Sequence, residues 1–210
     1  MVKIDDEFQS GTGHKVQIVY GTAPALRAKL QAGEQPDVLI SLAAEIDEME
    51  EHNKFAAIER GIARIKLGLA VRQGVSNPNI ATLEAFKQTL LKADSIIHNS
   101  LASGFLFAKQ LERIGIAEQV KSKIVLIKGN TQLAELAKRK GNDVAAGQLT
   151  QLITSKEVQF VGALPPEAQA ETVYSAVAFS TSKSPIAARA FVTYLAAPKA
   201  AAMFDAAGAR

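Results

Sequence analysis

Three segments of the chain place glycine, small residues and hydroxyl side chains directly before an expected helix. They are Gly21-Thr22-Ala23, Ala102-Ser103-Gly104 and Gly129-Asn130-Thr131-Gln132. The first turn of a helix has unpaired N–H groups and a partial positive charge, which together attract anions. The hydroxyls of Thr22, Ser103 and Thr131 could add donors without adding charge. Each segment alone is also what an ordinary helix cap requires, so the anion site depends on their convergence in one crevice.

Residues that could carry out catalysis form no recognisable pattern. His14, His52 and His98 lack the spacing of metal ligands, and cysteine is absent. The nucleophile motif Gly-x-Ser-x-Gly and a phosphate-loop lysine motif are also missing. His98 ends an expected strand near the proposed crevice, where it could contact a ligand or simply pack in the core. The sequence therefore favours a binding protein that needs no metal and no cofactor over an enzyme.

The composition is that of an ordinary folded protein. The 210 residues carry 24 Lys and Arg against 21 Asp and Glu, a formal net charge of +3, and 48% are hydrophobic. The basic residues are scattered and tryptophan is absent, so no nucleic-acid-binding face is expected. No apolar run reaches the ~18 residues of a membrane helix. The acidic start Met1–Glu7 does not look like a signal peptide, so we expect either a cytoplasmic protein or a processed form of an exported one.

Short strand-like runs alternate with helical patterns along the chain. The expected strands are Lys15–Tyr20, Asp37–Ser41, Lys66–Arg72, Ser95–His98, Lys123–Ile127, Asp143–Ala146, Val158–Val161 and Thr172–Ser180. Helices are expected between them, with Thr82 as one N-cap and prolines at Pro24, Pro185 and Pro198 in first turns. This rhythm predicts an α/β protein with mixed, mainly parallel sheets flanked by helices.

A collinear series of short motifs resembles one family along almost the whole chain. The series comprises Thr12-Gly13-His14-Lys15-Val16, Tyr20-Gly21-Thr22-Ala23, Leu30-Gln31-Ala32-Gly33-Glu34, Pro36-Asp37-Val38, Pro78-Asn79-Ile80, Ala102-Ser103-Gly104, Leu111-Glu112-Arg113-Ile114-Gly115-Ile116-Ala117, Val161-Gly162-Ala163-Leu164-Pro165 and Val173-Tyr174-Ser175-Ala176. It is similar to the molybdate-binding type of extracytoplasmic solute-binding proteins of ABC transporters. No single motif is diagnostic, and the conserved order of the series carries the resemblance.

The resemblance implies a periplasmic-binding-protein-like fold of type II, with two α/β lobes joined by two crossing strands. Lobe one would comprise residues 1–73 and 173–210, and lobe two residues 74–172, with crossings at Leu67–Arg72 and Val173–Phe179. It also implies the function of a periplasmic solute-binding component of an ABC importer. Such proteins hold molybdate or tungstate, as an oxyanion ligand, with hydroxyls and backbone N–H groups, and deliver it to the transporter's membrane subunits.

Seven ligand-binding positions follow from the resemblance. They are Thr22, Ala23, Ala102, Ser103, Thr131, Gln132 and Gln148. Gln148 falls where well-known members have a tyrosine that contacts the oxyanion, although an amide can also donate to an anion oxygen.

The start of the chain departs from the family pattern, because Met1–Gln9 corresponds to the end of the family's first helix. The first strand and its ligand-contacting serine have no counterpart, which predicts an incomplete lobe-one sheet and self-association through it. Three alternatives to the importer function stay open. They are an enzyme on the same fold acting on a phosphorylated small molecule, the sensing half of a transcription regulator, and a shortened member that binds nothing.

Overall fold

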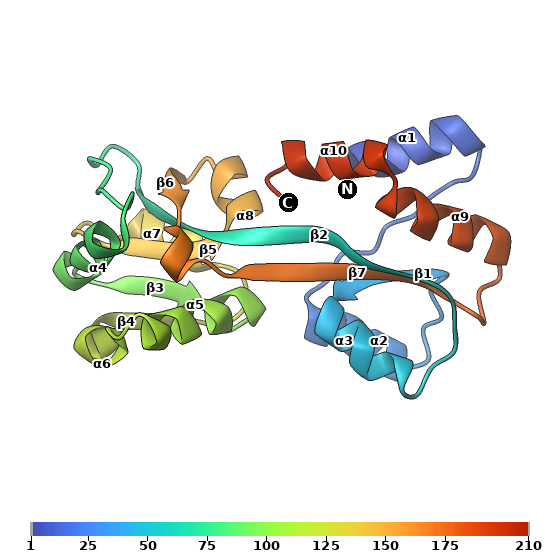
Figure 1. The fold of residues 1–210 in the computed structure, drawn as a ribbon, viewed down its shortest axis with the longest axis horizontal. Helices are drawn as coiled ribbons and strands as arrows, with labels where there is room; N and C mark the ends of the chain where they lie inside the picture. Colours follow the sequence, from blue (N-terminus) through green and yellow to red (C-terminus); the bar gives the residue numbers. More distant parts are fainter. Residues whose placement is uncertain (1, 210) are drawn as a thin grey trace. The chain divides into compact units, whose positions relative to one another are not determined.

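The computed structural model describes residues 2–209, which form two compact units (Figure 1). One unit comprises the chain up to Arg64 together with Val173–Gly208, and the other comprises Ile65–Thr172. The chain passes from one unit to the other along two strands, β2 (Phe55–Arg72) and β7 (Glu171–Phe179). The boundary of the units lies inside β2, whereas the sequence suggested a boundary just after this strand. The two units are called unit 1 and unit 2 below, and each is described by itself.

Unit 1 contains β1 (Val38–Leu42), β7 and the first half of β2, in this order in the sheet, and helices on either side of them. Strand β1 pairs antiparallel with β7, so that Val38 lies opposite Ala178. The helices are α1 (Val2–Thr12), α2 (Ala23–Gln31), α3 (Ala43–Glu50), α9 (Pro185–Ala196) and α10 (Pro198–Ala206). A proline is the first residue of α9 and of α10, and Pro24 lies in the first turn of α2, as the sequence predicted. Proline is tolerated in a first turn because the N–H group that it lacks has no partner within the helix there.

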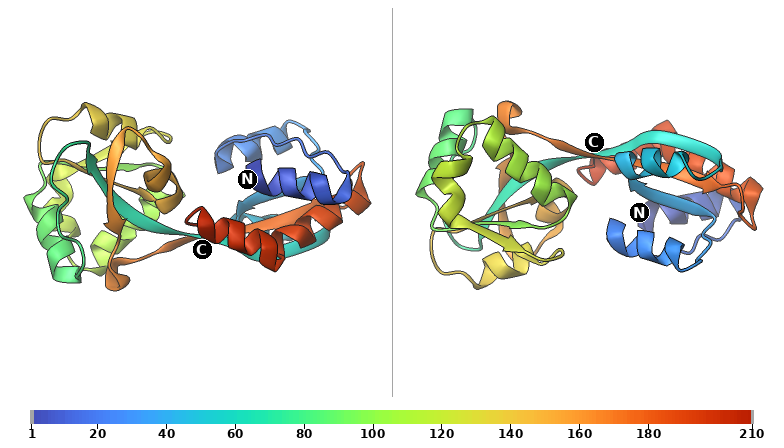
Figure 2. Two further views of the ribbon diagram at one scale, coloured as in Figure 1. Left: turned by 90° about the horizontal axis from the view of Figure 1, so that it is seen from above. Right: turned by 90° about the horizontal axis from the view of Figure 1, so that it is seen from below.

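Aromatic packing joins the helices of unit 1. The ring of Phe8 on α1 lies 4.9 Å from that of Phe191 and 5.4 Å from that of Tyr194, both on α9. Helices α1 and α10 run side by side next to α9 (Figure 2). On the other side of β1 and β7, Ile46 of α3 is completely buried against Leu39. The apolar stripes of these helices therefore cover both faces of the short sheet.

The strand expected at Lys15–Tyr20 is wrong. This segment forms no regular element and pairs with no strand among residues 2–209, and Val19 and Tyr20 are 58% and 67% exposed. Alternation of apolar and polar residues is necessary for a half-buried strand, but a strand also needs a neighbouring backbone to pair with. In the described chain β1 pairs only with β7, so its other edge has no partner.

Unit 2 contains a mixed sheet in which three neighbouring strands are parallel. Strand β3 (Ile96–Asn99) pairs in parallel with β4 (Ile124–Ile127) on one side and with β5 (Val144–Gln148) on the other. Strand β2 pairs antiparallel with β5 and with β6 (Val158–Ala163). The parallel pairs connect through helices, as the alternating strand and helix patterns predicted.

Helices cover both faces of the unit 2 sheet. Helices α5 (Ala102–Arg113) and α6 (Ala117–Val120) lie on one side of β3, and α7 (Gln132–Lys138) and α8 (Leu149–Thr154) lie on the other (Figure 1). Helix α4 (Leu83–Lys92) packs with α5 in one core, and two 3-10 turns, Lys121–Lys123 and Pro166–Ala168, complete the unit. A second core lies under α7 and α8. The central parallel strand β3 is thus buried on both faces, whereas Leu126 of the edge strand β4 is 58% exposed.

Strand β2 is much longer than the expected Lys66–Arg72. Its first half contains the charged pair Glu59-Arg60 and Gly61, which interrupt the apolar pattern. Gly61 has a φ of +66°, a conformation that favours glycine, and its N–H donates to Ser175 Oγ at 3.3 Å. This irregularity made the first half of the strand unrecognisable from the sequence.

Candidate functional site

The predicted residues of unit 2 lie at one edge of its sheet. Strands β5, β3 and β4 are parallel neighbours in this order, so their carboxyl ends meet at the same edge. Helix α5 begins after β3, α7 after β4 and α8 after β5. The structure therefore brings together the starts of three helices and the predicted residues of unit 2. These are Ala102, Ser103, Thr131, Gln132 and Gln148.

The start of α5 has two backbone donors without a partner. Asn99 Oδ1 accepts the N–H of Leu101 at 3.0 Å and that of Gly104 at 3.1 Å. The N–H groups of Ala102 and Ser103 make no hydrogen bond with any of residues 2–209. This helix spans 12 residues, which gives its first turn the partial positive charge of the macrodipole. Its first turn can therefore bind an anion through backbone groups.

Ser103 adds a side-chain donor to this turn. The residue is only 6% exposed, and its Oγ lies 3.2 Å from Asn99 Nδ2 and 3.4 Å from Asn99 Oδ1. An amide Nδ2 can only donate, so the hydroxyl accepts at the shorter contact, and it donates to Oδ1 at the longer one.

Gly104 allows the helix to start this close to β3. A Cβ atom at this position would lie 1.7 Å from the carbonyl oxygen of Asn99, far inside van der Waals contact. Only glycine fits there, because the obstacle is the backbone rather than a flexible side chain.

The start of α7 carries a chain of three amides. Gln132 is completely buried, and its Nε2 donates to Gln151 Oε1 at 3.3 Å. Gln151 Nε2 in turn donates to Asn130 Oδ1 at 2.6 Å. Gln132 Oε1 is buried without any partner among the described residues, which costs free energy in a protein interior. Thr131 next to it is exposed, and its side chain does not cap the helix.

Gln148 ends β5 and lies at the N-cap of the short helix α8. Its backbone is paired opposite Leu67 of β2, which fixes its position at the edge of the sheet. The residue is half-buried. It is therefore placed near the starts of α5 and α7 by the order of the strands.

Thr22 and Ala23 belong to unit 1, at the start of α2. Thr22 is exposed, its carbonyl accepts the N–H of Leu26 at 2.9 Å, and its hydroxyl makes no capping bond. The hydroxyl is thus free for another partner. That Thr22 and Ala23 share a ligand with unit 2 stays a prediction.

His98 is a packing residue in this structure. It is buried within β3, its ring lies 5.6 Å from that of Phe107, and its Nδ1 lies 3.1 Å from the carbonyl oxygen of Asn99. Burial lowers the pKa of His98 below its usual value, although the contact with Asn99 opposes this effect. The imidazole is therefore neutral near pH 7, and it adds no positive charge beside the start of α5.

No metal site is seen in residues 2–209, where no three His, Asp or Glu side chains gather in a suitable arrangement. No helix in the same part of the chain is long and apolar enough to span a bilayer. The predicted residues that meet at this edge of the unit 2 sheet all have neutral side chains. Two further residues of the site, Asn99 and Gln151, were not expected from the sequence. Their roles depend on side-chain hydrogen bonds that form only in the folded structure.

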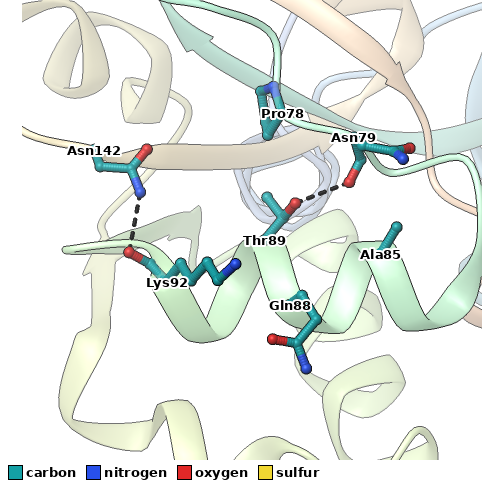
Figure 3. Close-up of a pocket in the computed structure, with 7 residues that line it drawn as sticks. All are labelled: Pro78, Asn79, Ala85, Gln88, Thr89, Lys92 and Asn142. Atoms are coloured by element: carbon teal, nitrogen blue, oxygen red, sulfur yellow. Dashed lines mark hydrogen bonds between the residues drawn. The ribbon is translucent and has the colours of Figure 1, made fainter.

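Two surface hollows lie elsewhere. One of about 310 Å³ in unit 2 is shown in Figure 3 and contains none of the predicted residues. There Thr89 Oγ1 donates to the carbonyl of Asn79 at 2.9 Å, and Asn142 Nδ2 donates to that of Lys92 at 3.0 Å. It lies near the amino end of β3, whereas ligands in α/β sheets bind at the carboxyl ends. The other, of about 1120 Å³, lies in unit 1 between residues 15–21 and the free edge of β1.

The two α/β units, each a sheet covered by helices, define a protein of the periplasmic-binding-protein-like class. The family model of the bacterial extracellular solute-binding proteins matches residues 1–210. The chain therefore belongs to this family. The resemblance to molybdate-type solute-binding proteins that the sequence motifs indicated is confirmed, and so is the expected fold class.

Solved structures support this assignment at the level of the fold. A substrate-binding domain assigned to a molybdenum ABC transporter of Clostridium difficile superposes with a TM-score of 0.79 at 17% identity, covering 100% of this chain and 92% of that one. The periplasmic molybdate-binding protein of Azotobacter vinelandii gives a TM-score of 0.76 at 19% identity, with 100% and 93% covered. At such identities the likeness concerns the fold alone.

A characterised relative is closer in sequence. An aconitate isomerase from Pseudomonas sp. is 30% identical over 208 residues, which cover 96% of this chain and 79% of the relative. A protein named for an enzymatic activity is thus related to this chain along nearly its whole length. The expectation that this chain is no enzyme stays open for that reason.

Proposed function

We propose that this protein binds a small oxyanion, such as molybdate or tungstate, as the periplasmic solute-binding component of an ABC importer. The observation that carries the proposal is the start of α5. Two N–H groups that have no partner among residues 2–209 lie there together with one almost completely buried hydroxyl, at the positive end of a 12-residue helix. Family membership supports the role in solute binding, and the importer's membrane subunits would be the partners.

Neutral donors suit a protein that must release its ligand. Each hydrogen bond to a charged group is worth about 1.5–3 kcal/mol, so several bonds can hold an anion without a buried counter-charge. We propose that Ala102, Ser103, Thr131, Gln132 and Gln148 supply donors from unit 2. Thr22 and Ala23 would supply donors from unit 1. The presence of Gln148 instead of a tyrosine would change the preference among anions.

Isomerisation of aconitate is a second candidate function, and the 30% identical aconitate isomerase favours it. Aconitate carries carboxylates, and the same neutral donors at the start of α5 would suit a carboxylate oxygen as well as a tetrahedral oxyanion. Such an enzyme also needs a group that moves a proton. His98 is a titratable side chain in the strand before this turn. Its ring is buried against Phe107, so it would have to become accessible to the ligand to move a proton.

Thermal unfolding with added anions tests both candidates. Molybdate, tungstate, sulfate and aconitate are each added at millimolar concentration. A ligand of the native state raises the stability by about 2.7 kcal/mol at a hundredfold excess over Kd. Molybdate or tungstate acting at the lowest concentration supports the importer role. Conversion of one aconitate isomer into the other, followed by NMR, supports the enzyme. If no anion shifts the transition, both candidates are wrong.

Two substitutions locate the site. Ser103→Ala and Thr22→Val should each weaken the bound anion about 10- to 100-fold, since each removes a bond to a charged ligand. Ser95→Ala is the control for the first, because Ser95 is equally buried but lies at the amino end of β3. Thr193→Val, at an exposed threonine of α9, is the control for the second. Equal affinity in all four variants would mean that these hydroxyls only cap helices.

A further inference from the structure

We propose that Asn99 is a positioning residue that determines which donors the start of α5 offers to the anion. The inference rests on the proposed anion site and concerns a residue that neither the motifs nor the comparisons assign. Asn99 is the last residue of β3 and only 1% exposed, so it acts through its neighbours rather than by touching the ligand.

The carbonyl end of the Asn99 side chain is fully used. An amide oxygen has two lone pairs, and Oδ1 accepts two backbone N–H groups, those of Leu101 and Gly104. These bonds satisfy two of the donors in the first turn. The N–H groups of Ala102 and Ser103, which lie between them in the chain, are left for a ligand.

The amino end of the same side chain orients the hydroxyl of Ser103. Nδ2 lies 3.2 Å from Oγ and can only donate, so it occupies an acceptor position of the hydroxyl. The hydroxyl donates in turn to Oδ1 over a longer contact of 3.4 Å, and Oδ1 already accepts two N–H groups, so this bond is the weaker one. A ligand oxygen at the start of α5 can therefore take over the hydroxyl proton of Ser103 at little cost. One buried amide thus leaves three donors in this turn, two N–H groups and one O–H group.

The backbone around Asn99 holds this arrangement in place. Gly104 lets the helix approach the carbonyl of Asn99, and the Nδ1 atom of His98 lies 3.1 Å from the same oxygen. The backbone of Asn99 is therefore held on both sides, and its side-chain amide cannot turn over without losing the two N–H bonds to Oδ1. The first turn should accordingly favour fully deprotonated oxygens, which accept three hydrogen bonds and need no acceptor in return.

Asn99→Asp separates this role from a purely structural one. Aspartate keeps the oxygen that accepts the two N–H groups, and the partial positive charge of the helix start favours its carboxylate, so the fold should be retained. Its second oxygen, however, accepts the Ser103 proton and places a negative charge beside the anion. We expect molybdate to bind about 100-fold more weakly at pH 8, measured by calorimetry, with aconitate as the probe if molybdate does not bind.

Two measurements show whether the loss of affinity in Asn99→Asp comes from the changed orientation of the Ser103 hydroxyl or from the added negative charge. Lowering the pH to 5 should restore part of the affinity of Asn99→Asp, because a protonated carboxyl again donates to Oγ. The affinity of the wild type at the same two pH values is the baseline, because the wild type also contains His98. In the Ser103→Ala background the effect of Asn99→Asp should shrink about tenfold, since the hydroxyl that it would turn is gone.

Asn142→Asp is the matched control. It adds the same charge to the same unit, at an exposed asparagine near the amino end of β3, and should leave the affinity within about twofold. If the effects of Asn99→Asp and Ser103→Ala multiply independently, or if acid restores nothing, Asn99 does not orient Ser103 and the inference is wrong while the proposed function stands. If the wild type binds neither probe, the proposed function fails and the inference fails with it.

Discussion

Gly104→Ala should disrupt the close packing of the start of α5 against the end of β3. The new Cβ would lie 1.7 Å from the carbonyl oxygen of Asn99 and 2.8 Å from its Oδ1, where contacts under 3.0 Å are essentially never observed. Because the nearest obstacle is backbone, the start of α5 has to move. Overpacking that shifts backbone costs about 1–3 kcal/mol, and losing the bond from the Gly104 N–H to Asn99 Oδ1 costs about 0.5–1.5 kcal/mol more. We expect a total loss of about 1.5–4.5 kcal/mol.

Urea unfolding followed by circular dichroism measures this loss, and amide hydrogen exchange shows whether it is centred on α5. Gly11→Ala is the matched control, because Gly11 lies in helix α1 with nothing within 4 Å of a new Cβ. It should stabilise the protein by about 0.5–1 kcal/mol, since alanine loses less backbone freedom in a helix. A Gly104→Ala protein that unfolds within about 0.5 kcal/mol of the wild type would refute the reasoning.

Two further predictions concern pH and association. Because burial lowers the pKa of His98 from its usual 6.5, the unfolded chain binds this proton more readily, so the free energy of unfolding should fall below pH 6.5, by at most ~1.4 kcal/mol per pH unit. His98→Gln should remove this slope in urea titrations and the exposed His52→Gln should not; a slope unchanged by His98→Gln contradicts the assignment. The free edge of β1 predicts concentration-dependent self-association in sedimentation. Val19→Lys, beside that edge, should weaken it, whereas Ile153→Lys, at a similarly exposed residue of unit 2, should not; a monomer at all concentrations would show that the edge is otherwise protected.

Local features of the fold were predictable from the sequence. Thr82 caps α4 as expected, with its Oγ1 accepting the N–H of Ala85 at 3.2 Å. Helices α9 and α10 begin at Pro185 and Pro198, also as expected. These signals act between residues a few positions apart, so the chain needs no tertiary structure to express them. The family resemblance likewise follows from the order of short motifs.

Strand pairing was not predictable in the same way. Lys15–Tyr20 has the alternation of a strand but no partner, while the first half of β2 lacks the pattern and is a strand nonetheless. A strand is stabilised by the backbone beside it, which is usually distant in sequence. Alternation alone therefore overestimates one segment and misses another.

Some features of the candidate site were likewise predictable from the sequence, and others were not. The sequence by itself determined that Ala102 and Ser103 begin a helix after a strand, because small and hydroxyl residues favour such starts. Only the tertiary structure decided that Asn99 takes up the N–H groups on either side of them and that Gln132 is buried with Gln151 as its partner. Those roles depend on atoms meeting within about 3 Å across a turn or between two helices. Residue types and spacing cannot specify such distances, since packing of the whole unit sets them.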